Sequence, residues 1–158
     1  MRKIKFKAKT FGDTAIHDGT EVCGSLIVYD WNKDVGIGNE YFIINEHGQF
    51  RVKPETIRQC TCRRDKNKKE IYEGDIIKKD GYLFQVKFGE YDNDYSDERH
   101  ACGIGWYLEY VDNGKYIEES VYDPDEDPKI IAFSPYLSDE YEIVGNIYDN
   151  PELKQKEV

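Results

Sequence analysis

Six cationic side chains between residues 58 and 69 are the clearest candidates for binding chemistry in the sequence. Clustered arginine and lysine side chains bind phosphates, so this segment is the best nucleic-acid candidate. Carboxylates at Glu55, Asp65, Glu70 and Glu73 lie among or beside the cations, a mixture more typical of a solvated connector or a protein contact. A nucleic-acid-associated regulator is therefore the alternative hypothesis, and protein contact is the favoured one. The candidate contact residues are Arg58, Arg63, Arg64, Lys66, Lys68 and Lys69.

Three groups of carboxylates offer oxygen ligands or proton-transfer groups. Glu73 and Asp75 flank Gly74, and a Gly-Asp pair before an apolar run commonly starts a strand, with the aspartate bonded to nearby backbone N–H groups. The tracts 90–98 and 123–127 are acidic but lack the glycine and terminal glutamate spacing of an EF-hand loop. We expect a structural role for the first group and no metal site at the other two.

The thiol and imidazole groups show no catalytic or metal-binding spacing. Cys60 and Cys62 form one C-x-C with no second pair at zinc-site spacing, and His17, His47 and His100 are scattered. No glycine-rich phosphate loop is present in the sequence. The sequence predicts no catalytic residue, no metal and no cofactor, and hence a protein that is not an enzyme.

The chain of 158 residues is acidic, with a formal net charge of −10. A negatively charged molecule repels nucleic acid as a whole, which disfavours general phosphate binding. The same charge admits a second alternative, an acidic mimic of DNA, if the carboxylates line one face. The apolar runs are too short for a membrane-spanning helix, and the N-terminal stretch lacks the apolar core of a signal peptide. We expect a cytoplasmic protein with reduced thiols and no membrane partner.

Alternation of apolar and polar residues predicts a strand at the start of the chain. Ile4, Phe6 and Ala8 alternate with lysines, so the apolar side chains point one way and the lysines the other. A solvated lysine face protects an edge strand from aggregation, which is the favoured interpretation. A lysine stripe that binds nucleic acid is the alternative.

The clearest hairpin signal follows the basic segment. Residues 70–79 are predicted as one strand with Gly74 inside it, and residues 82–88 as the next. Asp80-Gly81 separates them, and both residues tolerate the positive φ of a tight hairpin turn. The acidic stretch 89–100 is too polar to build a core and is predicted as a long exposed loop.

The frequent Gly, Asn and Asp turns and the absence of a sustained helical period predict a mainly β fold. Two architectures fit: a small barrel with SH3-like hairpin elements, or a barrel-like sandwich with an N-terminal β lobe. The predicted divisions are an N-terminal β lobe at 1–60, a basic connector at 61–69, a C-terminal β-barrel lobe at 70–151 and a frayed tail at 152–158.

Two motifs at distant positions carry a family resemblance. "DKNKKEIYEGDII" begins at Asp65, and "EIVGNIYDNPEL" begins at Glu142. Together with the basic first strand "RKIKFKAKT", they resemble the YopX family of phage and prophage proteins over nearly the whole chain. That family usually has Thr-Gly-Leu-Lys where this chain has Thr61-Cys62-Arg63-Arg64, and an Asn-Gly turn where it has Asn67-Lys68.

The resemblance implies a protein encoded by a phage or prophage that works inside a bacterial host cell. The family is largely uncharacterised, so it implies no catalytic residues. With the aromatic strands of the sequence, it favours an accessory protein that acts through protein contacts. The expected partners are other copies of the chain, as a homo-oligomer, and an unknown host or phage protein.

Overall fold

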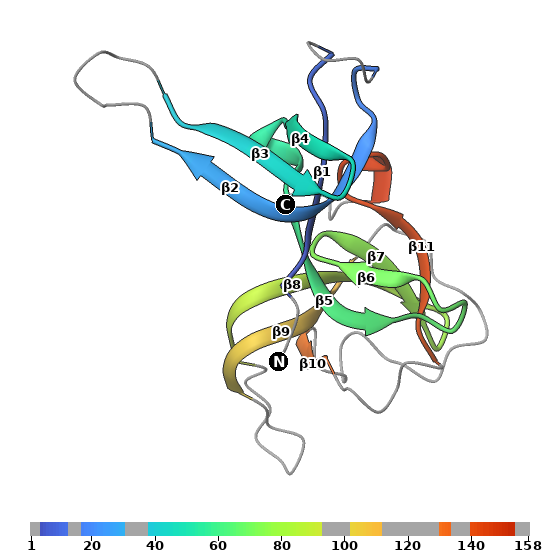
Figure 1. The fold of residues 1–158 in the computed structure, drawn as a ribbon. Helices are drawn as coiled ribbons and strands as arrows, with labels where there is room; N and C mark the ends of the chain where they lie inside the picture. Colours follow the sequence, from blue (N-terminus) through green and yellow to red (C-terminus); the bar gives the residue numbers. More distant parts are fainter. Residues whose placement is uncertain are drawn as a thin grey trace. The chain divides into compact units, whose positions relative to one another are not determined.

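The computed structural model describes residues 4–12, 17–30, 38–92, 102–111, 130–133 and 140–153 (Figure 1). The chain divides into two compact units, Met1–Cys62 and Arg63–Val158. The described residues are mainly β, as predicted, and contain no α-helix. The strands are β1 (Phe6–Lys9), β2 (Glu21–Tyr29), β3 (Glu40–Asn45), β4 (Gly48–Arg51), β5 (Arg58–Arg64), β6 (Glu70–Tyr72), β7 (Asp75–Lys79), β8 (Tyr82–Asp92), β9 (Cys102–Tyr110), β10 (Ile130–Ala132) and β11 (Glu142–Asn146). Two 3₁₀ turns, η2 (Pro54–Thr56) and η4 (Pro151–Leu153), complete the described elements.

The strands form two antiparallel sheets. Their orders are β4-β3-β2-β1-β5-β6 and β10-β9-β8-β7-β11, and the unit boundary falls within β5. Among the described residues neither sheet closes into a barrel, so the barrel architecture is not confirmed. An isolated antiparallel bridge, Thr10 to Val52, joins the residue after β1 to the residue after β4.

In the first unit, β1 is a central strand. It pairs with β2 from Phe6↔Gly24 to Lys9↔Glu21, and with β5 at Phe6↔Gln59. The edge-strand interpretation of its lysine face is therefore wrong, because apolar–lysine alternation is the same for central and edge strands. The Nζ of Lys7 lies 2.9 Å from a carboxylate oxygen of Glu21.

The core of the first unit is formed by apolar side chains of β1, β2 and β3 and by the residue after β4. Buried residues cluster around Ala8, Val22, Ile43 and Val52. The close approach of β2 to β3 depends on Gly24, because a Cβ there would lie 2.1 Å from the carbonyl oxygen of Ile44. Gly24 thus sets how tightly β2 packs on β3.

In the second unit, the predicted hairpin is confirmed. Lys79 pairs with Tyr82 across a two-residue turn, and Asp80 and Gly81 have φ of 49° and 90°. Positive φ at both positions matches the twist of the flanking strands. The single strand predicted over 70–79 is wrong, because Glu73 and Gly74 form a turn between β6 and β7.

The pair β8–β9 is longer than the sequence predicts. Gly89–Asp92 continue β8 and pair with Cys102–Gly105 of β9, so the loop predicted from residue 89 starts too early. Figure 1 shows the two strands running side by side as one long curved ribbon. Backbone pairing with β9 keeps this polar stretch extended, although its side chains do not belong to the hydrophobic core.

The core of the second unit lies against the base of this ribbon. Its buried members are Ile71, Ile77, Tyr82, Phe84, Val86, Leu108, Phe133 and Tyr141. Among the described residues, no helix is long and apolar enough to cross a membrane. Several predictions concern segments outside the described residues: the acidic tract at 93–98 and that at 123–127, His100, and residues 154–158 of the predicted tail.

Candidate functional site

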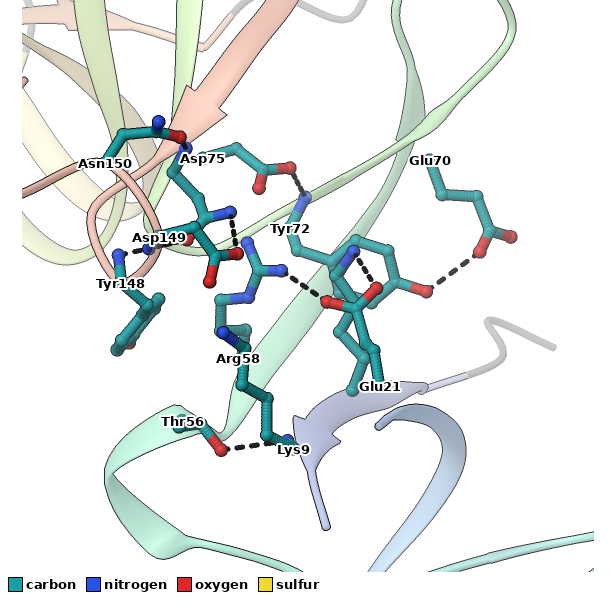
Figure 2. Close-up of polar contacts among 12 residues, drawn as sticks. Lys9, Glu21, Thr56, Arg58, Glu70, Tyr72, Asp75, Tyr148, Asp149 and Asn150 are labelled. Carbon is teal, nitrogen blue, oxygen red and sulfur yellow. Dashed lines mark hydrogen bonds and ion pairs between the residues drawn. The ribbon is translucent and has the colours of Figure 1, made fainter. Parts of the chain in front are cut away.

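Two of the six candidate cations are buried or half-buried in the fold. The side chain of Arg58 is buried, with the residue 4% exposed, and its guanidinium donates to a Glu21 carboxylate oxygen at 2.9 Å (Figure 2). Arg63 is half-buried; it donates to the backbone carbonyl of Phe133, and its guanidinium carbon lies 4.3 Å from the centre of that ring. These geometries favour a structural role for Arg58 and Arg63.

The other four cations remain at the surface. Arg64, Lys66, Lys68 and Lys69 are exposed, at the end of β5 and in the turn that follows it. Lys66 lies 2.7 Å from a carboxylate oxygen of Glu142 on β11. The exposed part of the basic segment is therefore smaller than the sequence suggests, and phosphate binding by it stays a prediction.

Asp65 organises the turn beneath these cations. The residue is only 4% exposed, and its carboxylate accepts backbone N–H bonds from Asn67 and Lys69 at 2.9 Å each and from Ile143 at 3.2 Å. The backbone N–H of Lys66 also donates to the carbonyl of Tyr141 at 2.9 Å. One buried carboxylate therefore fixes the turn and attaches it to β11.

The same contacts set the protonation of Asp65. Burial alone would raise the pKa of this carboxyl, because a charge loses solvation away from water. The backbone N–H groups of Lys69, Ile143 and Asn67, with the Asn67 amide, offset that effect and hold the pKa below its usual value of 3.8. Asp65 is therefore a charged structural group.

Two residues of this segment have backbone angles that favour glycine. Cys62 has a φ of 62° and Lys68 a φ of 64°. Both stand where the resembled motif has glycine, which adopts positive φ without a Cβ clash. The backbone keeps glycine-type angles at both positions, within β5 at Cys62 and in the following turn at Lys68, although both residues carry larger side chains, so the two departures add strain.

Replacing Lys68 by glycine should therefore stabilise the protein. A left-handed residue with a Cβ costs about 1–2 kcal/mol, part of which is offset by the greater freedom of glycine in the unfolded chain. We expect the free energy of unfolding to rise by about 0.5–1 kcal/mol, measured by urea denaturation. Lys69→Gly is the matched control: no positive φ occurs there, and stability should fall. Equal effects of the two substitutions would contradict the strain argument.

The Glu73-Gly74-Asp75 group is structural, as expected. Asp75 is buried, and its carboxylate accepts the backbone N–H of Tyr72 at 2.8 Å (Figure 2). The carbonyl of Gly74 accepts the backbone N–H of Ile147 at 3.0 Å. A Cβ on Gly74, whose φ is 77°, would lie 3.0 Å from the Tyr148 ring. The group therefore joins the β6–β7 turn to the turn after β11.

The turn after β11 depends on asparagine side chains. The Asn146 side-chain oxygen accepts the backbone N–H groups of Tyr148 and Asp149 at 3.0 Å each. The Asn150 side-chain oxygen accepts the N–H of Asn146 at 3.3 Å. The two motifs of the sequence thus meet in the second unit, where Asp65, Asp75, Asn146 and Asn150 accept backbone N–H groups, which stabilises the fold.

An exposed apolar surface lies elsewhere, on the outer part of the β8–β9 ribbon. We call residues 88–92 and 102–106 the β8–β9 arm. Phe88 is 49% exposed and Ile104 is 80% exposed, and the Phe88 ring contacts the Trp106 ring with centroids 5.0 Å apart. The sequence interpretation missed this surface because residues 89–92, which extend β8 along β9, were expected to belong to a loop. The alternation of Ile104 and Trp106 with glycines was the available signal.

A hollow of about 810 Å³ lies in the first unit, beside β2 and the β3–β4 turn. Its lining carries charges of both signs, with Lys5 beside the carboxylates of Glu21 and Glu46 among the lining residues. This mixture selects no class of ligand by charge. In the part of the chain that the structure describes, no group of three or more His, Cys, Asp or Glu side chains could hold a metal ion.

Comparison with known proteins identifies one family. The family model described as YopX protein matches residues 5–154. No curated protein matches the sequence. The matched range includes both motifs, the arm and the basic segment.

Proposed function

We propose that this chain, which belongs to the YopX family, is a phage- or prophage-type accessory protein of a bacterial cell that acts by binding another protein. The observation that supports the proposal is the apolar face of the β8–β9 arm. The polar groups of the two family motifs bond within the second unit, whereas Phe88 and Ile104 on the arm are exposed. Catalysis is no part of the proposal.

The exposed apolar side chains of the arm would be stabilised by contact with another protein. A two-stranded ribbon is marginally stable alone in water and gains stability when a hydrophobic face packs on something. Burying an isoleucine or phenylalanine side chain fully contributes about 1.5–3 kcal/mol. Ile104 retains most of its exposed surface, and Phe88 about half, so both have burial energy left for an intermolecular contact. A different protein or a second copy of the chain could provide it.

Site-specific photo-crosslinking in host cells tests the proposal. A photoreactive phenylalanine at position 104 should trap a discrete protein adduct. The matched control is position 144, because Val144 is also an exposed apolar residue, 43% exposed, on β11 outside the arm. An adduct from position 104 that is absent from position 144, and that disappears when Phe88 is changed to serine, is the expected result.

The outcomes separate the two classes of partner. An adduct of twice the chain mass identifies a second copy and hence a homo-oligomer, whereas any other discrete mass identifies a different protein. Identical adduct patterns from positions 104 and 144, or none from either, would contradict arm-mediated binding. Circular dichroism of the Phe88→Ser variant must show an unchanged β-sheet spectrum, so that loss of the adduct reports contact and not unfolding.

A further inference from the structure

One face of the β8–β9 arm changes from apolar to acidic along its length. Directly opposite residues of an antiparallel pair share a face. Phe88 lies opposite Trp106 at the base, and Ile104 lies opposite Glu90 farther out. Asp92 follows on the same face, opposite Cys102. The face therefore offers aromatic and aliphatic surface next to carboxylates.

The backbone beside this face has an open edge. β10 pairs with β9 only at Tyr107–Glu109, and the carbonyl of Trp106 accepts the N–H of Phe133. Among the described residues, no strand pairs with 102–105 on that side of β9. An unpaired strand edge is a template for an added extended segment, which gains main-chain hydrogen bonds and places alternate side chains on one face.

We infer that the β8–β9 arm binds an extended segment of another protein in which every second residue lies on the face of the arm, first apolar residues and then lysine or arginine. Apolar side chains would cover Ile104 and Phe88, and the cations would lie near Glu90 and Asp92. Charge complementarity favours this occupant over a second copy, because two chains of net charge −10 repel each other and would bring the same carboxylates together. This inference rests on the proposed function and names the chemistry of its partner.

Fluorescence titration with synthetic peptides tests the inference. The sequence has two tryptophans, so Trp31→Phe leaves Trp106 as a single reporter on the arm. Three peptides of about eight residues, a strand's length, serve as probes, each with serine at every second position. At the remaining positions the Lys-Val peptide has two valines and then two lysines, the Glu-Val peptide two valines and then two glutamates, and the Lys-Ser peptide two serines and then two lysines. We expect the Lys-Val peptide to shift the Trp106 emission saturably, and to bind at least about tenfold more tightly than the other two.

Variants and changes in salt concentration then test the apolar and the electrostatic contributions to peptide binding separately. Ile104→Ser should weaken Lys-Val binding by about tenfold or more, and Glu90→Lys should weaken it and reduce its dependence on salt. Val144→Ser, off the arm, should leave binding unchanged. Equal binding of the Glu-Val peptide, no saturable shift, or a concentration-dependent shift without peptide that accompanies a dimer mass in light scattering would each overturn the inference. A crosslinked partner at position 104 together with no Lys-Val binding would leave the proposed function standing and remove only this partner class.

Discussion

The variant Asp65→Ala should lose about 3 kcal/mol or more of unfolding free energy in the second unit. Its carboxylate accepts backbone N–H groups from Asn67, Lys69 and Ile143. Alanine would leave these donors without an acceptor, and each buried unmet donor costs about 1–3 kcal/mol, less where water can reach it. Urea denaturation followed by Trp106 fluorescence in the Trp31→Phe background measures the loss.

Two control variants separate the loss of the backbone contacts of Asp65 from the loss of any carboxylate. Asp18→Ala removes a carboxylate whose side chain is 63% exposed and whose partner is Lys53, and it should change stability by less than about 1 kcal/mol. Asp65→Asn keeps one acceptor oxygen and should fall between the alanine variant and the native chain. If Asp65→Ala costs no more than Asp18→Ala, the attachment of the turn to β11 is not a major source of stability.

The same carboxylate makes stability depend on pH. The pKa of Asp65 is below 3.8 in the folded chain, so the unfolded chain binds a proton at Asp65 more readily than the folded chain does. Its contribution is fully present above pH 3.8 and is lost as the pH falls through the folded pKa. In acid titrations the native chain should lose more stability below this value than Asp65→Asn does.

The second large effect is expected from Gly24→Ala. A Cβ at Gly24 would lie 2.1 Å from the carbonyl oxygen of Ile44 and 3.0 Å from a methyl carbon of Ile43. A backbone oxygen cannot move without separating β2 from β3, so we expect a loss of about 3 kcal/mol, at the upper end for overpacked cores. Hydrogen–deuterium exchange of β2 and β3 should accelerate correspondingly.

Another strand glycine provides the matched control for this substitution. At Gly105 a Cβ would have no atom within 4 Å, and Gly105→Ala should be neutral or stabilise by up to about 1 kcal/mol. Equal effects at the two positions would show that the close approach at Gly24 does not limit the packing of β2 on β3.

Local signals in the sequence predicted local structure well. Asp80-Gly81 gave a correct hairpin because a two-residue turn with positive φ is encoded by the residues that form it. The bond from Tyr72 to Asp75 was likewise expected, because a short aspartate side chain reaches only nearby backbone. Fold class followed from the same short-range patterns.

Features that depend on strand order could not be predicted. The burial of Arg58 requires Glu21, which is 37 positions away in the sequence and becomes its neighbour only because β1 lies between β2 and β5. The alternation of β1 is the same at the edge and the centre of a sheet. The arm was missed for a related reason, since Gly89–Asp92 are held extended by pairing with β9 rather than by their own preferences.

The contact between Asp65 and Ile143 also bears on how the chain is made. The two residues are 78 positions apart, so a ribosome synthesises Asp65 long before Ile143 exists. At a translation rate of about 5–20 residues per second, roughly 4–16 seconds pass between the synthesis of Asp65 and that of its donor Ile143. During translation the turn after β5 can close on Asn67 and Lys69, but the second unit is completed only when β11 emerges.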